Sequence, residues 1–146
     1  MPADAVEVPA EELDVQRIRA GVPAWGSELD GDTIPATVGQ WVIDASVSFT
    51  KGCYTGQELV ARIDSRGGNV PRHLMGLVID GPPPATGTVI TVEGAPAGAV
   101  TSSALDGATG STVALGFVPR SIEVGVDGTK AEVAGVPARL VPLPIT

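Results

Sequence analysis

Apolar and polar positions follow different patterns in the two halves of the chain, with helix-like spacing first and strand-like alternation later. Residues 9–20 have acidic residues near the beginning, arginines near the end and Gly21 directly after them, which predicts a helix. The apolar stripe of this helix is thin, so the helix needs a partner surface to be stable. Residues 21–48 show no clear period, and such a stretch is long for a compact domain. We expect it to wrap over a surface, or part of that surface to be missing from this chain.

The strongest helix prediction covers residues 55–68. Thr55 and Glu58 have the spacing of a capping box, in which Thr55 is the N-cap. Tyr54 and Leu59 have the spacing of a hydrophobic staple around the same cap. Two consecutive glycines near the end of the segment predict where the helix stops.

Residues 72–146 change to short apolar or alternating runs, which are typical of strands. Gly94 and Gly135 each lie in a short connection between two such runs, and each connection predicts a hairpin. The alternation of Val113, Leu115 and Phe117 predicts a strand with these three side chains on one face. The predicted strand segments are residues 74–79, 88–93, 97–102, 113–117, 131–134 and 138–141. About five to seven short strands at this spacing predict a small antiparallel barrel or sandwich.

The charge of the chain restricts its partners. Seventeen Asp and Glu residues against nine Lys and Arg residues give a formal net charge of −8. This charge argues against direct binding to nucleic acid or to an anionic membrane, and no apolar run approaches the roughly 20 residues of a membrane-spanning helix. The balance is uneven, because residues 51–75 contain four basic and two acidic residues. We expect the chemistry of the protein in this net-positive segment.

The chain has one cysteine, Cys53, and one histidine, His73. A disulfide within the chain is therefore excluded, and a Cys/His zinc site lacks ligands within one chain. The free cysteine and the lack of a visible secretory signal predict a cytoplasmic location. His73 lies at the beginning of a predicted strand, and we interpret it as a structural or surface residue.

Two acidic features have simple interpretations. Asp30 and Asp32 flank Gly31, which favours a turn, because a calcium loop would need further ligands at fixed offsets. The acid-rich residues 1–32 are expected to form a solvated face.

Residues 51–58 read Lys-Gly-Cys-Tyr-Thr-Gly-Gln-Glu and place the thiol of Cys53 shortly before the predicted N-cap. Free backbone N–H groups and the helix dipole favour an anion at such a position, and Lys51 adds a positive charge. These effects favour the thiolate form. The same position can hold the carboxylate or phosphate of a ligand, since its glycines permit close approach of the backbone. The alternative is a buried cysteine that serves as a small apolar side chain beside a capped helix.

This octapeptide, continued by Leu-Val-Ala-Arg at residues 59–62, resembles the signature of the YgfZ-type folate-binding proteins. These are relatives of the aminomethyltransferase, or T-protein, of the glycine cleavage system. The supporting segments are residues 17–23, 33–35, 114–118 and 138–144, so the resemblance covers almost the whole chain.

The resemblance implies a fold and a domain organisation. Residues 1–70 resemble the end of an α+β, T-protein-like folate-binding domain, and residues 71–146 resemble the all-β, small antiparallel barrel that follows it. Family members are longer, so this chain resembles the last part of such a protein. The N-terminal half, which builds much of the folate pocket, is the missing part.

Two residues depart from the pattern of the family. Arg19 stands where relatives have a glutamate that contacts the pterin of tetrahydrofolate, which puts that contact in question here. Gln57 stands where T-proteins usually have an arginine, which favours the YgfZ branch over a true aminomethyltransferase.

The resemblance also implies a function, namely assembly or repair of iron–sulfur clusters in client enzymes, including tRNA-modifying ones, with tetrahydrofolate as cofactor. Cys53 is then the functional, catalytic thiol. The expected partners are iron–sulfur client proteins or assembly factors, folate, and the missing N-terminal half. The residues expected to shape the cofactor-binding site are Lys51, Gly52, Tyr54, Gly56, Gln57, Glu58 and Arg62.

Two other functions stay open. One is a folate-dependent, aminomethyltransferase-like enzyme, which needs a complete pterin pocket and an acid near the folate nitrogen. The other is a non-catalytic interaction barrel from a truncated or split gene. That alternative predicts exposed apolar surface in the first 48 residues, from the side chains of Trp25, Ile34, Trp41 and Val42.

Overall fold

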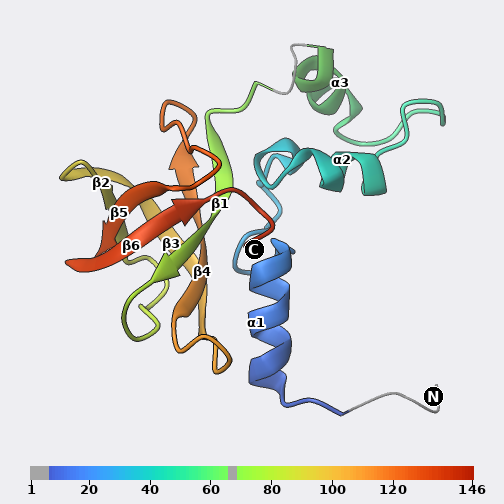
Figure 1. Ribbon diagram of the computed structural model, residues 1–146. Coiled ribbons are helices and arrows are strands. Elements are labelled where there is room, and N and C mark those ends of the chain that lie inside the picture. The colour runs from blue at the N-terminus through green and yellow to red at the C-terminus, as the bar shows by residue number, and fades with distance from the viewer. Residues whose placement is uncertain (1–6, 66–68) are drawn as a thin grey trace.

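The computed structural model describes residues 7–65 and 69–146, and it shows helices in the N-terminal part followed by a closed barrel (Figure 1). The fold class predicted from the sequence is therefore confirmed. The helical elements are α1 (Ala10–Ala20), the 3-10 turn η1 (Pro35–Thr37), α2 (Gln40–Ser46) and α3 (Gln57–Ser65). The strands are β1 (Arg72–Ile79), β2 (Val89–Val92), β3 (Ala95–Leu105), β4 (Thr112–Pro119), β5 (Thr129–Val133) and β6 (Val136–Val141).

Helix α1 confirms the first helix prediction. Pro9 is the N-cap, so it lies one residue before the helix and not at its first position. Gly21 ends the helix in the left-handed conformation with φ of 71°, which glycine adopts without strain. The N–H of Gly21 donates to the Ile18 carbonyl, and the N–H of Val22 donates to the Arg17 carbonyl. The sequence signal at Gly21 therefore reports a real helix end.

The stretch at residues 21–48 is more regular than its sequence indicates, because it contains η1 and α2. Helix α2 has only seven residues and buries Ile43 alone. So short a helix gives no detectable apolar period. The turn predicted at Asp30 is present, since the N–H of Asp32 donates to the Asp30 carboxylate at 3.0 Å.

Helix α3 confirms the existence of the predicted helix but corrects its beginning. The Gly56 carbonyl accepts the N–H groups of Leu59 and Val60 at 3.1 and 3.2 Å, so Gly56 and not Thr55 is the N-cap. Gly56 has φ of 85°, a conformation that disfavours any residue with a side chain. The predicted end of this helix, at residues 66–68, lies outside the described residues.

The barrel consists of six antiparallel strands in the order β1-β4-β3-β2-β5-β6, closed by pairing of β6 with β1. Both predicted hairpins are present, and both have tighter turns than expected. Glu93 and Gly94 connect β2 to β3 with φ of 53° and 78°. Ala134 and Gly135 connect β5 to β6 with φ of 52° and 77°. Positive φ at both turn residues matches the twist of the paired strands.

Strand β4 is buried on both faces. Ala114 and Val118 belong to the core inside the barrel, whereas Val113 and Leu115 belong to a second core outside it. The predicted alternation of Val113, Leu115 and Phe117 is thus confirmed, and this face of the strand is covered by the N-terminal part of the chain.

Helix α1 lies against the outside of the barrel (Figure 1). Its buried residues Val15 and Ile18 pack in the second core with Leu74 of β1. The C-terminal tail completes this core, because the N–H of Ile145 donates to the Arg19 carbonyl at 2.7 Å and the Ile145 side chain is buried. The barrel therefore supplies the partner surface that α1 needs.

The solvated acidic face predicted for residues 1–32 is wrong for Glu28. This side chain is buried, and its carboxylate accepts hydrogen bonds from the Ser102 hydroxyl at 2.6 Å and from the Ala24 N–H at 2.9 Å. Nη1 of Arg17 also lies 3.3 Å from Oε2 of this carboxylate. A carboxylate with these donors is tolerated inside a protein, and it joins the N-terminal part to the barrel.

Candidate functional site

Cys53 lies in the loop between α2 and α3, and its side chain is exposed. The alternative of a buried, merely apolar cysteine is therefore wrong. A shallow hollow of about 480 Å³ opens beside it. Six of the eight residues predicted for the site line this hollow together with Leu59, namely Cys53, Tyr54, Gly56, Gln57, Glu58 and Arg62.

Lys51 and Gly52 do not line the hollow but lie next to it in the chain. The Lys51 ammonium lies 4.8 Å from the centroid of the Tyr54 ring, which is within the range of a cation–π interaction. The Lys51 N–H also donates to the Ser48 hydroxyl at 3.2 Å. A Cβ at Gly52 would meet nothing within 4 Å, so this glycine leaves open space beside the thiol.

The helix position explains how these residues come together. Gln57, Glu58 and Arg62 are within the first two turns of α3, and the Gln57 N–H donates to the Tyr54 carbonyl at 3.2 Å. The lining therefore combines a thiol, an amide, a carboxylate and a guanidinium over one helix end. Such groups can pair with the polar edge of a ligand, and the predicted preference of this position for an anion stays a prediction.

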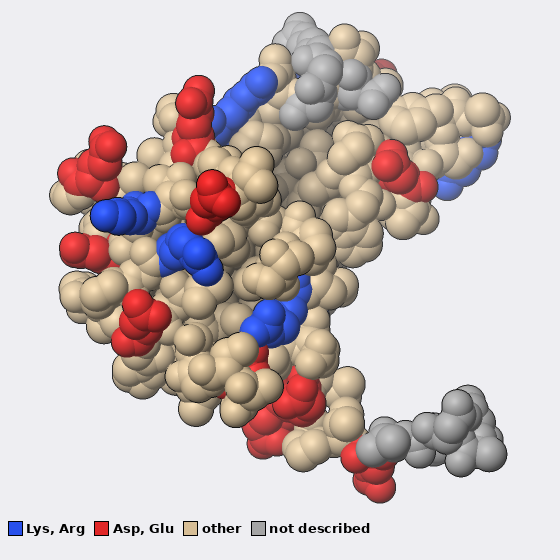
Figure 2. Space-filling view, viewed as in Figure 1, with Lys and Arg blue, Asp and Glu red and all other residues tan. Residues whose placement is uncertain are grey.

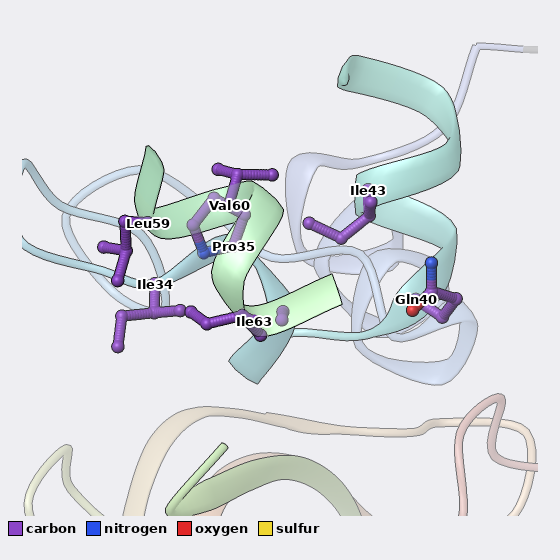
Figure 3. A pocket seen from close by; sticks show the side chains of 8 residues that line it. Ile34, Pro35, Gln40, Ile43, Leu59, Val60 and Ile63 are labelled. Atoms are coloured by element: carbon purple, nitrogen blue, oxygen red, sulfur yellow. The ribbon is translucent and has the colours of Figure 1, made fainter. Parts of the chain in front are cut away.

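An apolar pocket lies between η1, α2 and α3 and shares Leu59 with the hollow (Figure 3). Ile34 and Leu59 point into it from one side, and Ile43 lies opposite, on α2. The enclosed space is about 20 Å³, close to the volume of one water-sized probe. We interpret it as a seam that holds α3, not as a ligand site. The sequence prediction missed this pocket because one of its walls, from Ile34 to Ile43, comes from the stretch without a visible period; the other wall is the predicted helix α3.

Arg19 is directed toward the barrel. Its Nε donates to the Asp106 carboxylate at 3.0 Å, and its Nη2 contacts the same oxygen. The hydrogen bond from Arg19 is the main reason why the pKa of Asp106 lies below its ordinary value of 3.8, and the N–H of Ala108 adds to it. This position therefore offers a paired guanidinium and no carboxylate of its own.

His73 lies in β1 and does not line the hollow. Burial, together with the charge of Arg120, lowers its pKa from 6.5. Among the side chains that the structure describes, no group of three or more His, Cys, Asp or Glu residues is placed to hold a metal ion. Within residues 7–65 and 69–146, every helix is too short or too polar to cross a lipid bilayer.

Charged side chains are mixed on the face of the molecule in Figure 2. Lys and Arg side chains are scattered among Asp and Glu side chains there, without one large basic surface. The absence of a large basic surface on this face agrees with the net charge of −8 of the sequence.

Comparison with known proteins identifies the barrel. Residues 72–146, just over half of the chain, match the sequence model of the glycine cleavage T-protein C-terminal barrel domain. The chain is 33% identical over 137 residues to an aminomethyltransferase of Rubrobacter xylanophilus, covering 90% of this chain and 34% of that protein.

Shorter matches connect the chain to two further proteins. It is 46% identical over 52 residues to the tRNA-modifying protein YgfZ of Serratia proteamaculans, covering 36% of this chain and 16% of that protein. It is 44% identical over 64 residues to the mitochondrial iron–sulfur cluster assembly factor IBA57 homolog of Eremothecium gossypii, covering 43% of this chain and 14% of that protein.

The fold has a counterpart among solved structures. Aminomethyltransferase T of the Bartonella henselae glycine cleavage system aligns with a TM-score of 0.66 and 23% identity, over 91% of this chain and 37% of that chain. The chain thus spans about a third of the length of the aminomethyltransferases that it matches.

Proposed function

Because the chain belongs to the family of the glycine cleavage T-protein and its YgfZ-type relatives, we propose that it is the cysteine-bearing part of a folate-binding protein. The C-terminal barrel domain of the family lies at residues 72–146. In this proposal the protein supports the assembly or repair of iron–sulfur clusters. Its clients include tRNA-modifying enzymes. The observation that carries this proposal is the exposed thiol of Cys53 beside a polar hollow. The names of the YgfZ and IBA57 relatives support the direction of the proposal.

In this proposal residues 1–70 are the end of the folate-binding domain, and Cys53 is the functional thiol. Gln57, Glu58 and Arg62 offer donors and acceptors for the polar edge of tetrahydrofolate, and the Tyr54 ring offers an aromatic surface. These groups fit part of such a ligand, which supplies one-carbon chemistry when bound. The hollow is shallow, so we propose that the rest of the pocket comes from a polypeptide that corresponds to the N-terminal part of the longer relatives, which we count among the partners. We place this function in the cytoplasm, where a free thiol stays reduced.

The direct experiment replaces Cys53 in the full-length context. Cys53→Ala and Cys53→Ser are expected to lower the activity of a dependent iron–sulfur enzyme in cells, with the abundance of the protein unchanged. Thr50→Ala is the matched control, because Thr50 is an exposed residue of the same loop outside the hollow. Undiminished client activity in both Cys53 variants would reject the role of this thiol.

A second candidate function is folate-dependent aminomethyl transfer. It is favoured by the coverage of the matches, since the Rubrobacter aminomethyltransferase aligns with 90% of this chain and the YgfZ protein with 36%. The pairing of Arg19 with Asp106 speaks against it, because no free carboxylate is then offered at that position. Titration of the chain with tetrahydrofolate tests independent catalysis, and no binding at millimolar ligand would exclude it.

A third candidate is a non-catalytic interaction barrel. Trp25 is 78% exposed and Trp41 is 46% exposed, which supports the apolar surface that this function predicts. Ile34 and Val42 are half-buried, so they contribute less to such a surface. Co-expression with a polypeptide that corresponds to the N-terminal part of the longer relatives should protect both tryptophans from an aqueous quencher of fluorescence. Unchanged quenching would count against the pairing.

A further inference from the structure

A groove runs along the outside of the barrel at the seam between β3 and β4, away from the residues of the Cys53 hollow. Its volume is about 380 Å³, which is within the range of small-molecule sites. Apolar walls come from Pro71, Ala99 and Pro119, and Arg72 supplies the charge. The two linings share no residue, so the groove is a separate site.

The backbone explains why the groove stays open. Pairing of β3 with β4 ends at Ala99 opposite Phe117, and Pro119 at the end of β4 has no N–H to continue the ladder. Gly98 approaches β4 so closely that a Cβ there would lie 2.0 Å from the Phe117 carbonyl oxygen. Position 98 therefore cannot carry a side chain, so this part of the groove lining consists of backbone only.

The guanidinium of Arg72 is held in place without a carboxylate partner among the described residues. Its Cζ lies 4.4 Å from the centroid of the Phe117 ring, a cation–π contact. In the part of the chain that the structure describes, the arginines with a carboxylate within 4.0 Å are Arg17 and Arg19. An exposed cation that is stacked but not ion-paired keeps its N–H edge available for an anion.

Asp30 is an acidic group in the surroundings of Arg72, whose charge is the smallest of the causes that lower the pKa of Asp30. The Thr33 hydroxyl contributes more, and it donates to the Asp30 carboxylate together with the Asp32 N–H. Asp30 is thus occupied by its own turn and does not neutralise Arg72 by contact.

We infer that this groove binds a small amphipathic carboxylate, with the anion on the Arg72 guanidinium and an aromatic or branched aliphatic body between Pro71, Ala99 and Pro119. Arginine suits this task because its planar fork meets both carboxylate oxygens. The site lies on the barrel and does not depend on the proposed role of Cys53.

Titration of the whole 146-residue chain with 1-naphthoate, followed by amide chemical shifts, tests the inference. We expect saturable shifts at Gly98, Thr101 and Phe117. The neutral isostere 1-naphthamide should bind at least about tenfold more weakly, the scale of a lost charge-assisted hydrogen bond. Absence of saturation up to about 10 mM naphthoate, or equal binding of the amide, would overturn the inference.

Substitutions test whether the charge of Arg72 is responsible for the binding of naphthoate. Arg72→Gln should weaken naphthoate binding about tenfold or more, whereas Arg139→Gln, an equal change of charge at another exposed arginine, should leave it within about twofold. Arg72→Lys should be intermediate, because it keeps the charge and loses the fork. Equal weakening by Arg72→Gln and Arg139→Gln would show a general charge effect and overturn the site. If Arg72→Gln does not fold, the comparison of naphthoate with naphthamide on the unchanged chain still decides.

Discussion

The Glu28 carboxylate accepts a hydrogen bond from the Ser102 hydroxyl at 2.6 Å, across 74 positions of the chain. Both residues are buried, Glu28 in the segment before η1 and Ser102 in β3. A second pair, Arg19 with Asp106, joins the end of α1 to the loop after β3. Together with the apolar contacts of Val15 and Ile18, these pairs fix α1 on the barrel. The two parts of the chain therefore meet through specific polar contacts as well as through an apolar core.

Ser102→Ala should lower the free energy of unfolding by about 1–3 kcal/mol, because it leaves an oxygen of a buried carboxylate without its donor. Urea denaturation of the purified chain measures this change. Ser27→Ala is the control, since Ser27 is exposed beside Glu28 and should stay within about 0.5 kcal/mol of the parent chain. Equal effects of the two variants would show that the Ser102 hydroxyl is not needed.

The lowered pKa of Asp106 predicts that the stability of the folded chain decreases as the solution becomes acidic. This pKa is lowered from 3.8, first by the hydrogen bond from Arg19. A carboxyl whose pKa falls on folding stabilises the folded state above its ordinary pKa, and this stabilisation is lost as pH falls through the lowered value. Asp106→Asn should therefore reduce the urea midpoint at about pH 7, and the difference from the parent chain should shrink below about pH 4.

The control for this titration is Asp127→Asn, which changes an exposed carboxyl and should barely alter the midpoint at any pH. A difference between Asp106→Asn and the parent chain that stays constant down to about pH 2.5 would contradict the assigned role of the Arg19 pair.

Gly76→Ala should destabilise the chain by about 1–3 kcal/mol through overpacking. A Cβ at this position would lie 2.7 Å from Cγ1 of Ile145 and 3.1 Å from Cγ2 of Val141. Gly107→Ala is the control, because a Cβ there meets nothing within 4 Å. Thermal or urea unfolding measures both variants.

Coupling between Gly76 and the C-terminal tail can be measured separately. Ile145→Ala removes the side chain that Gly76→Ala would strike, so the double variant should cost less than the sum of the two single variants. Strict additivity would mean that the tail does not pack over Gly76.

Cys53 should react with a soluble thiol reagent in the native protein at nearly the rate seen in denaturant, because its side chain is exposed. Absorbance during reaction with a disulfide reagent gives both the rate and the stoichiometry. Cys53→Ser removes the only thiol and should abolish the signal. A native rate that follows global unfolding would show that the thiol is protected.

Local sequence signals predicted much of the barrel. Gly94 and Gly135 marked the hairpins because two-residue turns with positive φ favour glycine. Gly21 marked the end of α1 for the same conformational reason. The pairing of β1 with β4 and of β2 with β5 could not be read in this way, because these strands are far apart in the chain.

The candidate site was predictable where its residues are neighbours in the chain. Cys53, Gln57 and Arg62 meet because they lie within a loop and the first turns of one helix. The burial of Glu28 was not predictable, since its donors include Ser102, which is 74 positions away in the chain. Helix α2 was missed because its seven residues bury one side chain.

Closure of the six strands decides how other proteins can recognise the barrel. Each strand has a hydrogen-bonded neighbour on both sides, so the barrel presents no free edge. This closure disfavours a partner that binds by adding a strand, and it disfavours edge-to-edge joining of copies of the barrel into a growing sheet. Recognition is then expected through side chains on the outer wall or through the helical segments that lie against it.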